Sequence, residues 1–116
     1  MTVRECYDSF GGDYSGVMGR LMKEERIIKY AKMFCAGDDC AQISKALKEE
    51  RYEDAFRSVH NLKGMSLNLG LTPISTTSSD LCEAVRHGKP SEDPTSLLNA
   101  MVDAWNSVTT ALKQLF

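Results

Sequence analysis

The spacing of the apolar residues constrains the fold of this chain more than any other feature. Along most of the sequence they recur at steps of three and four positions, and Gly, Asp or Pro interrupts them between segments. This period gathers apolar side chains on one face of a helix, whereas the strict alternation typical of half-buried strands is nearly absent. The sequence therefore predicts an all-α fold without a sheet.

Capping residues divide the pattern into helices. The clearest helix runs from Tyr52 to Leu69, and Gly70 follows it where a left-handed residue ends a helix. Asp39, with Gln42 three residues on, predicts one helix start, and Thr72 before Pro73 predicts another. Pro94 is predicted to open the last helix. The predicted helices cover residues 2–10, 13–22, 24–35, 39–49, 52–69, 74–87 and 94–115.

Short connections between the longer helices favour antiparallel neighbours. We therefore expect an antiparallel up-down four-helix bundle with additional short N-terminal helices. The length of 116 residues is that of one ordinary domain, and no linker divides it, so residues 1–116 are predicted to form a single domain.

Charge and composition exclude several classes of partner. The net charge is −2, and a mildly acidic balance argues against general binding to nucleic acid or to an anionic membrane. The apolar runs are far shorter than the roughly 20 residues of a membrane helix, and the start lacks the apolar core of a signal peptide. We expect a cytoplasmic monomer, and a start at Met1 favours a free-standing protein.

No metal site or common enzyme motif is recognisable. The four cysteines form no C-x-x-C pair, and with only two histidines no zinc spacing results, so we expect mostly buried thiols and no metal. Phosphate loops, nucleophile elbows and kinase signatures are also missing. If the protein handles phosphate, another protein must supply it. The cysteines are Cys6, Cys35, Cys40 and Cys82.

The unusual stretch begins at His60, in the middle of the clearest helix. The position lies about 100° round the helix from the core stripe, at the shoulder of the buried face. Lys63 and Gly64 follow at i+3 and i+4 on neighbouring rows. A neutral imidazole is a competent nucleophile near neutral pH, and a lysine can partly neutralise the phosphoryl group it would acquire. These residues together fit an imidazole that carries phosphate.

Gly64 is otherwise hard to explain, because a glycine inside an exposed helix costs about 1 kcal/mol relative to alanine. Its missing side chain would clear space over His60 for another protein. The simpler interpretation is that an exposed histidine is only a polar surface residue. For His87, in the last turn before Gly88, we prefer that interpretation, since a cation suits the negative end of a helix dipole.

The segment from Ala55 to Gly70 resembles the signature helix of histidine-containing phosphotransfer domains. In that family an amphipathic helix bears His-x-Leu-Lys-Gly and then a small-residue run ending in Asn-Leu-Gly. Residues 52–56 and 79–86 are also similar to the family, whereas Met65 and Leu67 stand where it often has smaller residues. The matching positions are His60, Leu62, Lys63, Gly64, Ser66, Asn68, Leu69 and Gly70.

The resemblance implies a phosphorelay protein. Such domains are antiparallel four-helix bundles that accept a phosphoryl group from the aspartyl phosphate of a response-regulator receiver domain and pass it to another. They have no catalytic machinery of their own and need no cofactor, since the receiver supplies the acidic pocket and its magnesium ion. The partners would be receiver domains and hybrid sensor kinases.

By this resemblance each residue of the stretch has an expected role. His60 would be the phosphoacceptor through Nε2, Lys63 would steady the phosphoryl charge, and Gly64 would permit close docking. Phe56, Arg57 and Leu67 are the expected docking surface.

Two other classes of function remain open from the sequence. One is a helical interaction module that binds receiver domains without phosphoryl chemistry. The other is an enzyme, such as a phosphohistidine phosphatase or a dimerising kinase fragment, although a kinase would need an ATP-binding domain for which this chain has no room. Retention of phosphate distinguishes a carrier from both.

Overall fold

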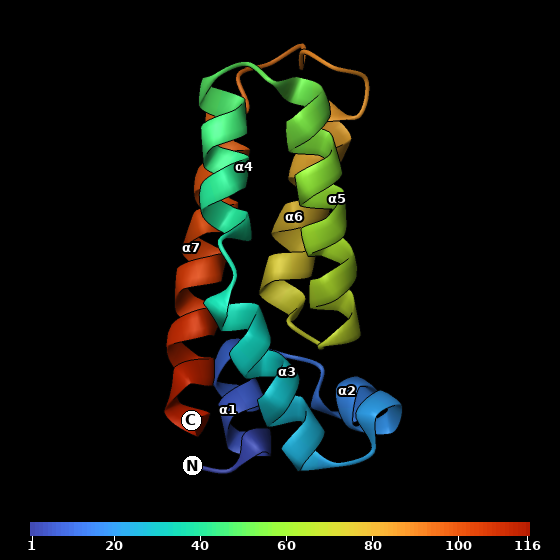
Figure 1. Cartoon of the computed structure of the whole chain (residues 1–116), viewed down its shortest axis with the longest axis vertical. Coiled ribbons are helices and arrows are strands. Elements are labelled where there is room, and N and C mark those ends of the chain that lie inside the picture. The colour runs from blue at the N-terminus through green and yellow to red at the C-terminus, as the bar shows by residue number, and fades with distance from the viewer.

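A computed structural model describes residues 1–116 and contains only helices and their connections (Figure 1). The all-α prediction is confirmed. In chain order the elements are α1 (Val3–Phe10), α2 (Tyr14–Leu21), α3 (Glu24–Ala36), α4 (Asp39–Lys48), α5 (Tyr52–Asn68), α6 (Thr72–Val85), α7 (Thr95–Leu112) and the 3₁₀ turn η1 (Lys113–Leu115).

Helices α4 to α7 form the antiparallel up-down bundle that the short connections predict. Each packs on the next, and α7 closes the bundle against α4 (Figure 1). The longest helix, α7, continues past α4 to contact α3 and α1 at the end of the molecule where both termini lie. The short N-terminal helices are thus stacked at one end of an elongated molecule of 42 × 22 × 20 Å.

One hydrophobic core of 23 buried residues includes side chains from every α-helix. Val59 and Leu62 of α5 are fully buried, as their spacing predicts. The interface between α5 and α6 also buries Ser66 and Ser78, whose hydroxyls donate hydrogen bonds to carbonyls of their own helices. Because these side chains are small and satisfied internally, the two helices pack closely without an unpaired polar group.

Two predicted helix N-caps were wrong by one residue. The carbonyl of Asp38 accepts the first helical hydrogen bond of α4, from the backbone N–H of Gln42, so Asp38 is the N-cap and Asp39 is already helical. Helix α6 likewise starts at Thr72, because the carbonyl of Leu71 accepts from the next turn. The side chain of Leu71 is fully buried, and this packing places the helix start ahead of the hydroxyl residue.

The ends of the connection between α6 and α7 also differ from the prediction. Helix α6 ends at Val85, so His87 lies in the turn beyond the helix and not in its last turn. Helix α7 begins at Thr95, after Pro94. The carboxylate of Asp93 accepts from the backbone N–H of Thr95 at 2.9 Å and satisfies a donor that the first helical turn leaves free.

The N-terminal residues are fastened to the C-terminal end of α5. Gly70 has φ 69°, and a Cβ there would lie 2.6 Å from the carbonyl oxygen of Asp13, so only glycine fits this crossing. The N–H of Asp13 donates to the carbonyl of Gly70 at 2.9 Å. The buried Tyr7 hydroxyl donates to the carbonyl of Leu69 at 2.7 Å.

Arg20 of α2 adds two further hydrogen bonds at the same place. Its guanidinium donates to the carbonyls of Asn68 and Leu67, at 2.9 and 3.0 Å. The carbonyl of Leu67 also accepts from the backbone N–H of Gly70 at 3.2 Å, whereas that of Asn68 has no other donor, so the bond to Asn68 satisfies a group that would otherwise need water. The N-terminal helices therefore fix one end of the helix that carries His60.

Candidate functional site

His60 lies midway along α5, on the face turned away from the bundle core. Its side chain is exposed, as predicted, because its neighbours Val59 and Leu62 are the residues that anchor α5 in the core. The side-chain hydrogen bonds of α5 are made by other residues, and neither imidazole nitrogen has a partner in the protein. Both nitrogens are therefore open to an incoming group.

An aromatic ring lies directly against this imidazole. The centroids of the Phe56 and His60 rings are 5.8 Å apart, and the ring planes are inclined by 22° in a stacked arrangement. The guanidinium carbon of Arg86, from the end of α6, lies 5.8 Å from the Phe56 centroid. Phe56 is half-buried and packs against the core, so it belongs to the site and to the bundle at once.

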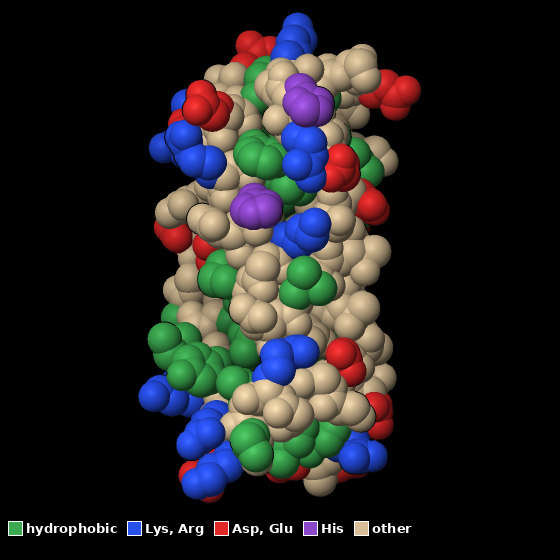
Figure 2. Space-filling view, turned by 90° about the vertical axis from the view of Figure 1, so that its right-hand side faces the viewer, with side chains coloured by type: hydrophobic (Ala, Val, Ile, Leu, Met, Phe, Trp, Pro, Cys, Tyr) green, Lys and Arg blue, Asp and Glu red, His purple; other side chains and the backbone are tan.

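Two cations, Lys63 and Arg86, lie near α6 on this side of the bundle, and Arg86 is paired there with Glu83. Burial raises the pKa of the Cys82 thiol, and the nearby positive charges of Lys63 and Arg86 partly offset this increase. Both cations therefore lie near the part of α6 that contains Cys82. Lys63 takes part in none of the ion pairs of the chain, which join other side chains at the α4–α5 corner and within α6. Figure 2 shows Lys and Arg side chains beside both histidines on this face.

Gly64 is not required by the packing of the fold. A Cβ at this position would meet no atom within 4 Å, and the backbone is ordinary helix. The absence of a side chain therefore leaves open space one turn beyond His60, where a helical side chain would lean back toward the imidazole.

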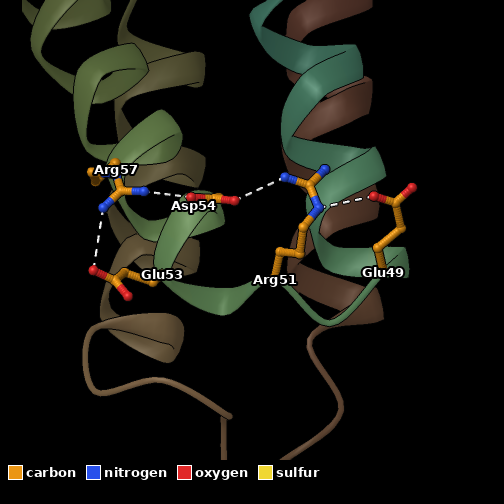
Figure 3. Close-up of polar contacts among 5 residues, drawn as sticks. All are labelled: Glu49, Arg51, Glu53, Asp54 and Arg57. Carbon is orange, nitrogen blue, oxygen red and sulfur yellow. Dashed lines mark hydrogen bonds and ion pairs between the residues drawn. The ribbon is translucent and has the colours of Figure 1, made fainter.

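The two other predicted docking residues have different surroundings. Arg57 is held within its own helix by ion pairs to Glu53, at 3.2 Å, and to Asp54 (Figure 3). Arg51 continues this chain of charges by bridging Asp54 and Glu49 across the corner between α4 and α5. Arg57 thus already has carboxylate partners and contributes to the surface of that corner.

Leu67, in contrast, is unengaged. Its side chain is 53% exposed two turns beyond His60 on the same outward row, so it is available to a partner. The structure thus places Phe56, Lys63 and Gly64 around the imidazole, Leu67 further along the row, and Arg57 in an ion-pair network.

The sequence reasoning missed two features near the site. Arg86 was not singled out, although antiparallel packing of adjacent helices places the end of α6 beside the first half of α5. The second is an apolar groove of about 480 Å³ between α2, α3, α5 and the start of α4. Two of its lining residues, Met33 and Met65, are exposed methionines. The groove is lined by Arg20, Leu21, Tyr30, Met33, Phe34, Asp39, Met65, Asn68 and Leu69.

No group of three or more His, Cys, Asp or Glu side chains is placed to hold a metal ion. None of the helices combines the length and the apolar character needed to cross a membrane.

The comparison with known families agrees with this geometry. The sequence profile of the Hpt domain matches residues 35–115, which include the four bundle helices α4 to α7. The chain belongs to the Hpt domain family, which confirms the resemblance seen in the sequence. Family membership implies involvement in a phosphorelay with receiver domains and kinases, and members are in general carriers without catalytic machinery. No curated protein and no solved structure matches the chain significantly.

Proposed function

We propose that this protein is a phosphorelay carrier in which His60 accepts a phosphoryl group from one receiver aspartate and passes it to another. The observation that carries the proposal is the open imidazole of His60, with Gly64 beside it at a position where the fold needs no glycine. The whole chain acts as one domain in this proposal, monomeric and cytoplasmic.

The proposed transfer uses only two groups of this chain, the imidazole of His60 and the ammonium group of Lys63. The lone pair of the His60 Nε2 attacks the phosphorus of the aspartyl phosphate, the N–P bond forms, and the bond from phosphorus to the aspartate oxygen breaks to return a carboxylate. The reverse reaction delivers the group to the next receiver. The ammonium group of Lys63 offsets the charge of the phosphoryl group, and the magnesium ion belongs to the receiver.

The arrangement around the imidazole favours this role over a plain interaction surface. A binding module needs no open nitrogen and no unpaired lysine beside it, and a mid-helix glycine would only weaken its helix. Phe56 and Leu67 extend the proposed contact area with the receiver, whereas the ion pairs of Arg57 make it the weakest of the docking candidates.

The test is a transfer experiment with a purified receiver domain labelled on its aspartate in the presence of magnesium. The proposal predicts that the label moves to this chain and is retained as acid-labile, alkali-stable phosphate, the behaviour of a phosphoramidate. Binding without label would support the interaction module instead. Release of free phosphate without retention would indicate a phosphatase.

A further inference from the structure

The stacking of Phe56 on His60 has a geometric origin in the helix. The two residues are four positions apart, and helical side chains lean toward the N-terminus, so the imidazole lies over the turn that Phe56 occupies. The ring centroids are 5.8 Å apart with an inclination of 22°. Such pairs attract beyond their burial, so the contact favours one orientation of an otherwise exposed imidazole.

The Phe56 ring is itself held in place by a residue at the end of the neighbouring helix α6. Phe56 packs against the hydrophobic core, and the guanidinium of Arg86 lies 5.8 Å from its ring centroid. Arg86 is fixed in turn, because its Nε donates to the Glu83 carboxylate at 3.1 Å and its Nη2 donates to the same oxygen. A chain of contacts therefore runs from α6 through Phe56 to the imidazole.

We propose that Phe56 is a positioning residue for phosphoryl transfer, and that Arg86 supports it from α6. Stacking uses the face of the imidazole, whereas the lone pair of a ring nitrogen lies in the plane of the ring. The contact can therefore orient His60 without covering the atom that reacts. This inference rests on the proposed function and gives Phe56 a role that does not depend on contact with a receiver.

A small phosphoryl donor separates positioning from docking, since it makes no protein–protein contacts. With phosphoramidate, the lone pair of the His60 Nε2 attacks phosphorus and the P–N bond of the donor breaks. Ammonia leaves and takes up the proton that the imidazolium loses. The product is His60 phosphorylated on Nε2 through the new N–P bond, and no metal or second protein is required.

The experiment compares the full-length wild type with Phe56→Leu and Phe56→Tyr. We expect Phe56→Leu to be labelled by phosphoramidate roughly 2- to 10-fold more slowly, the range that one lost aromatic pair supplies. Phe56→Tyr should restore the rate because it restores the ring. Tyr30→Leu is the matched control: it removes an exposed aromatic ring from α3, away from His60, and should leave labelling by the small donor unchanged.

A spectroscopic measurement tests the contact without any transfer. The carbon-bound protons of the His60 ring lie close to the Phe56 ring, so Phe56→Leu should shift their NMR signals and Phe56→Tyr should largely preserve them. The signals of His87 provide an internal reference. If Phe56→Leu unfolds, Arg86→Gln replaces it, since Arg86 is exposed and its loss should move both readouts in the same direction by less.

Unchanged His60 signals together with an unchanged labelling rate in a folded variant would overturn the proposal. This outcome is distinct from failure of the proposed function. A wild type that shows the ring contact and takes label from phosphoramidate, yet takes none from a phosphorylated receiver, would contradict the carrier role and leave the positioning of His60 intact.

Discussion

Replacing Gly64 with Gln tests whether this glycine is needed for docking or has no role in it. A Cβ at this position meets no atom within 4 Å, so a side chain enters without clash. Glycine costs about 1 kcal/mol relative to alanine in a helix, and Gln a few tenths of that, so Gly64→Gln should stabilise the protein by roughly 0.5 kcal/mol. For a domain of this size the gain corresponds to about 2 °C in Tm.

The effect on transfer should have the opposite sign. A glutamine at i+4 leans back toward the turn of His60 and covers the imidazole. Because reacting atoms must come within about 3.5 Å, and a misplacement of about 1 Å can cost 100-fold, we expect transfer from a phosphorylated receiver to slow by two orders of magnitude or more. Labelling of the same variant by phosphoramidate should change by only a few fold, since the small donor still reaches the ring.

Gly19 offers a matched control. It is also a helical glycine at which a Cβ would meet no atom within 4 Å, but it lies in α2. Gly19→Gln should raise Tm by a similar amount and transfer at the wild-type rate. Thermal melts and rapid-quench transfer on both variants decide the matter. A stable Gly64→Gln protein that transfers normally would refute the docking argument.

Three further predictions concern the charge of Lys63, the hydrogen bonds from Arg20 to the end of α5, and the pH dependence of stability. Lys63→Met should slow transfer to His60 roughly 10-fold or more in rapid-quench assays, because one charge-assisted contact with the phosphoryl group is lost; an unchanged rate would exclude that contact. Arg20→Ala should lower the free energy of unfolding in urea by about 1 kcal/mol, since the carbonyl of Asn68 loses its donor and that of Leu67 loses one of two; an equal loss in Lys32→Ala, an exposed position without an ion pair, would contradict this. Burial raises the pKa of the Tyr7 hydroxyl and of all four thiols, so the folded protein keeps protons that the unfolded chain releases. Stability should therefore be flat near neutral pH and fall as the pH rises above about 9, the usual pKa of a thiol, in melts under reducing conditions.

Most of the architecture follows from the sequence because the helical period and the glycine stops are local signals. The helix carrying His60 was predicted within one residue at its C-terminal end, and Gly70 has the left-handed conformation that its position indicates. The N-caps predicted at Asp39 and Thr72 were wrong because the preceding residues, Asp38 and Leu71, take the cap position. At α6 the burial of Leu71 decided the boundary, and a local motif does not contain that packing. At α4 the exposed Asp38 takes the cap position through its contacts with Gln42 in the same helix.

The site was only partly predictable for a similar reason. The positions of His60, Lys63 and Gly64 on one helix follow from helical geometry, so their exposure and proximity could be expected. The contact of Arg86 with the Phe56 ring, in contrast, joins two helices and depends on their relative register. The ion pairs of Arg57 depend on which rotamer a long side chain adopts among several carboxylates, which spacing alone leaves open.

Locating the phosphate on the chain tests most directly whether His60 is the phosphoacceptor. Wild type, His60→Gln and His87→Gln are each incubated with a phosphorylated receiver, and the labelled residue is identified by mass spectrometry under alkaline conditions. We expect a phosphohistidine at position 60 in the wild type, full labelling of His87→Gln and none of His60→Gln. Both histidines are exposed, but only His60 lies inside a helix with a lysine at i+3 and a glycine at i+4. Histidine label on a folded His60→Gln protein, or wild-type label found at position 87, would contradict the assignment of His60 as the phosphoacceptor.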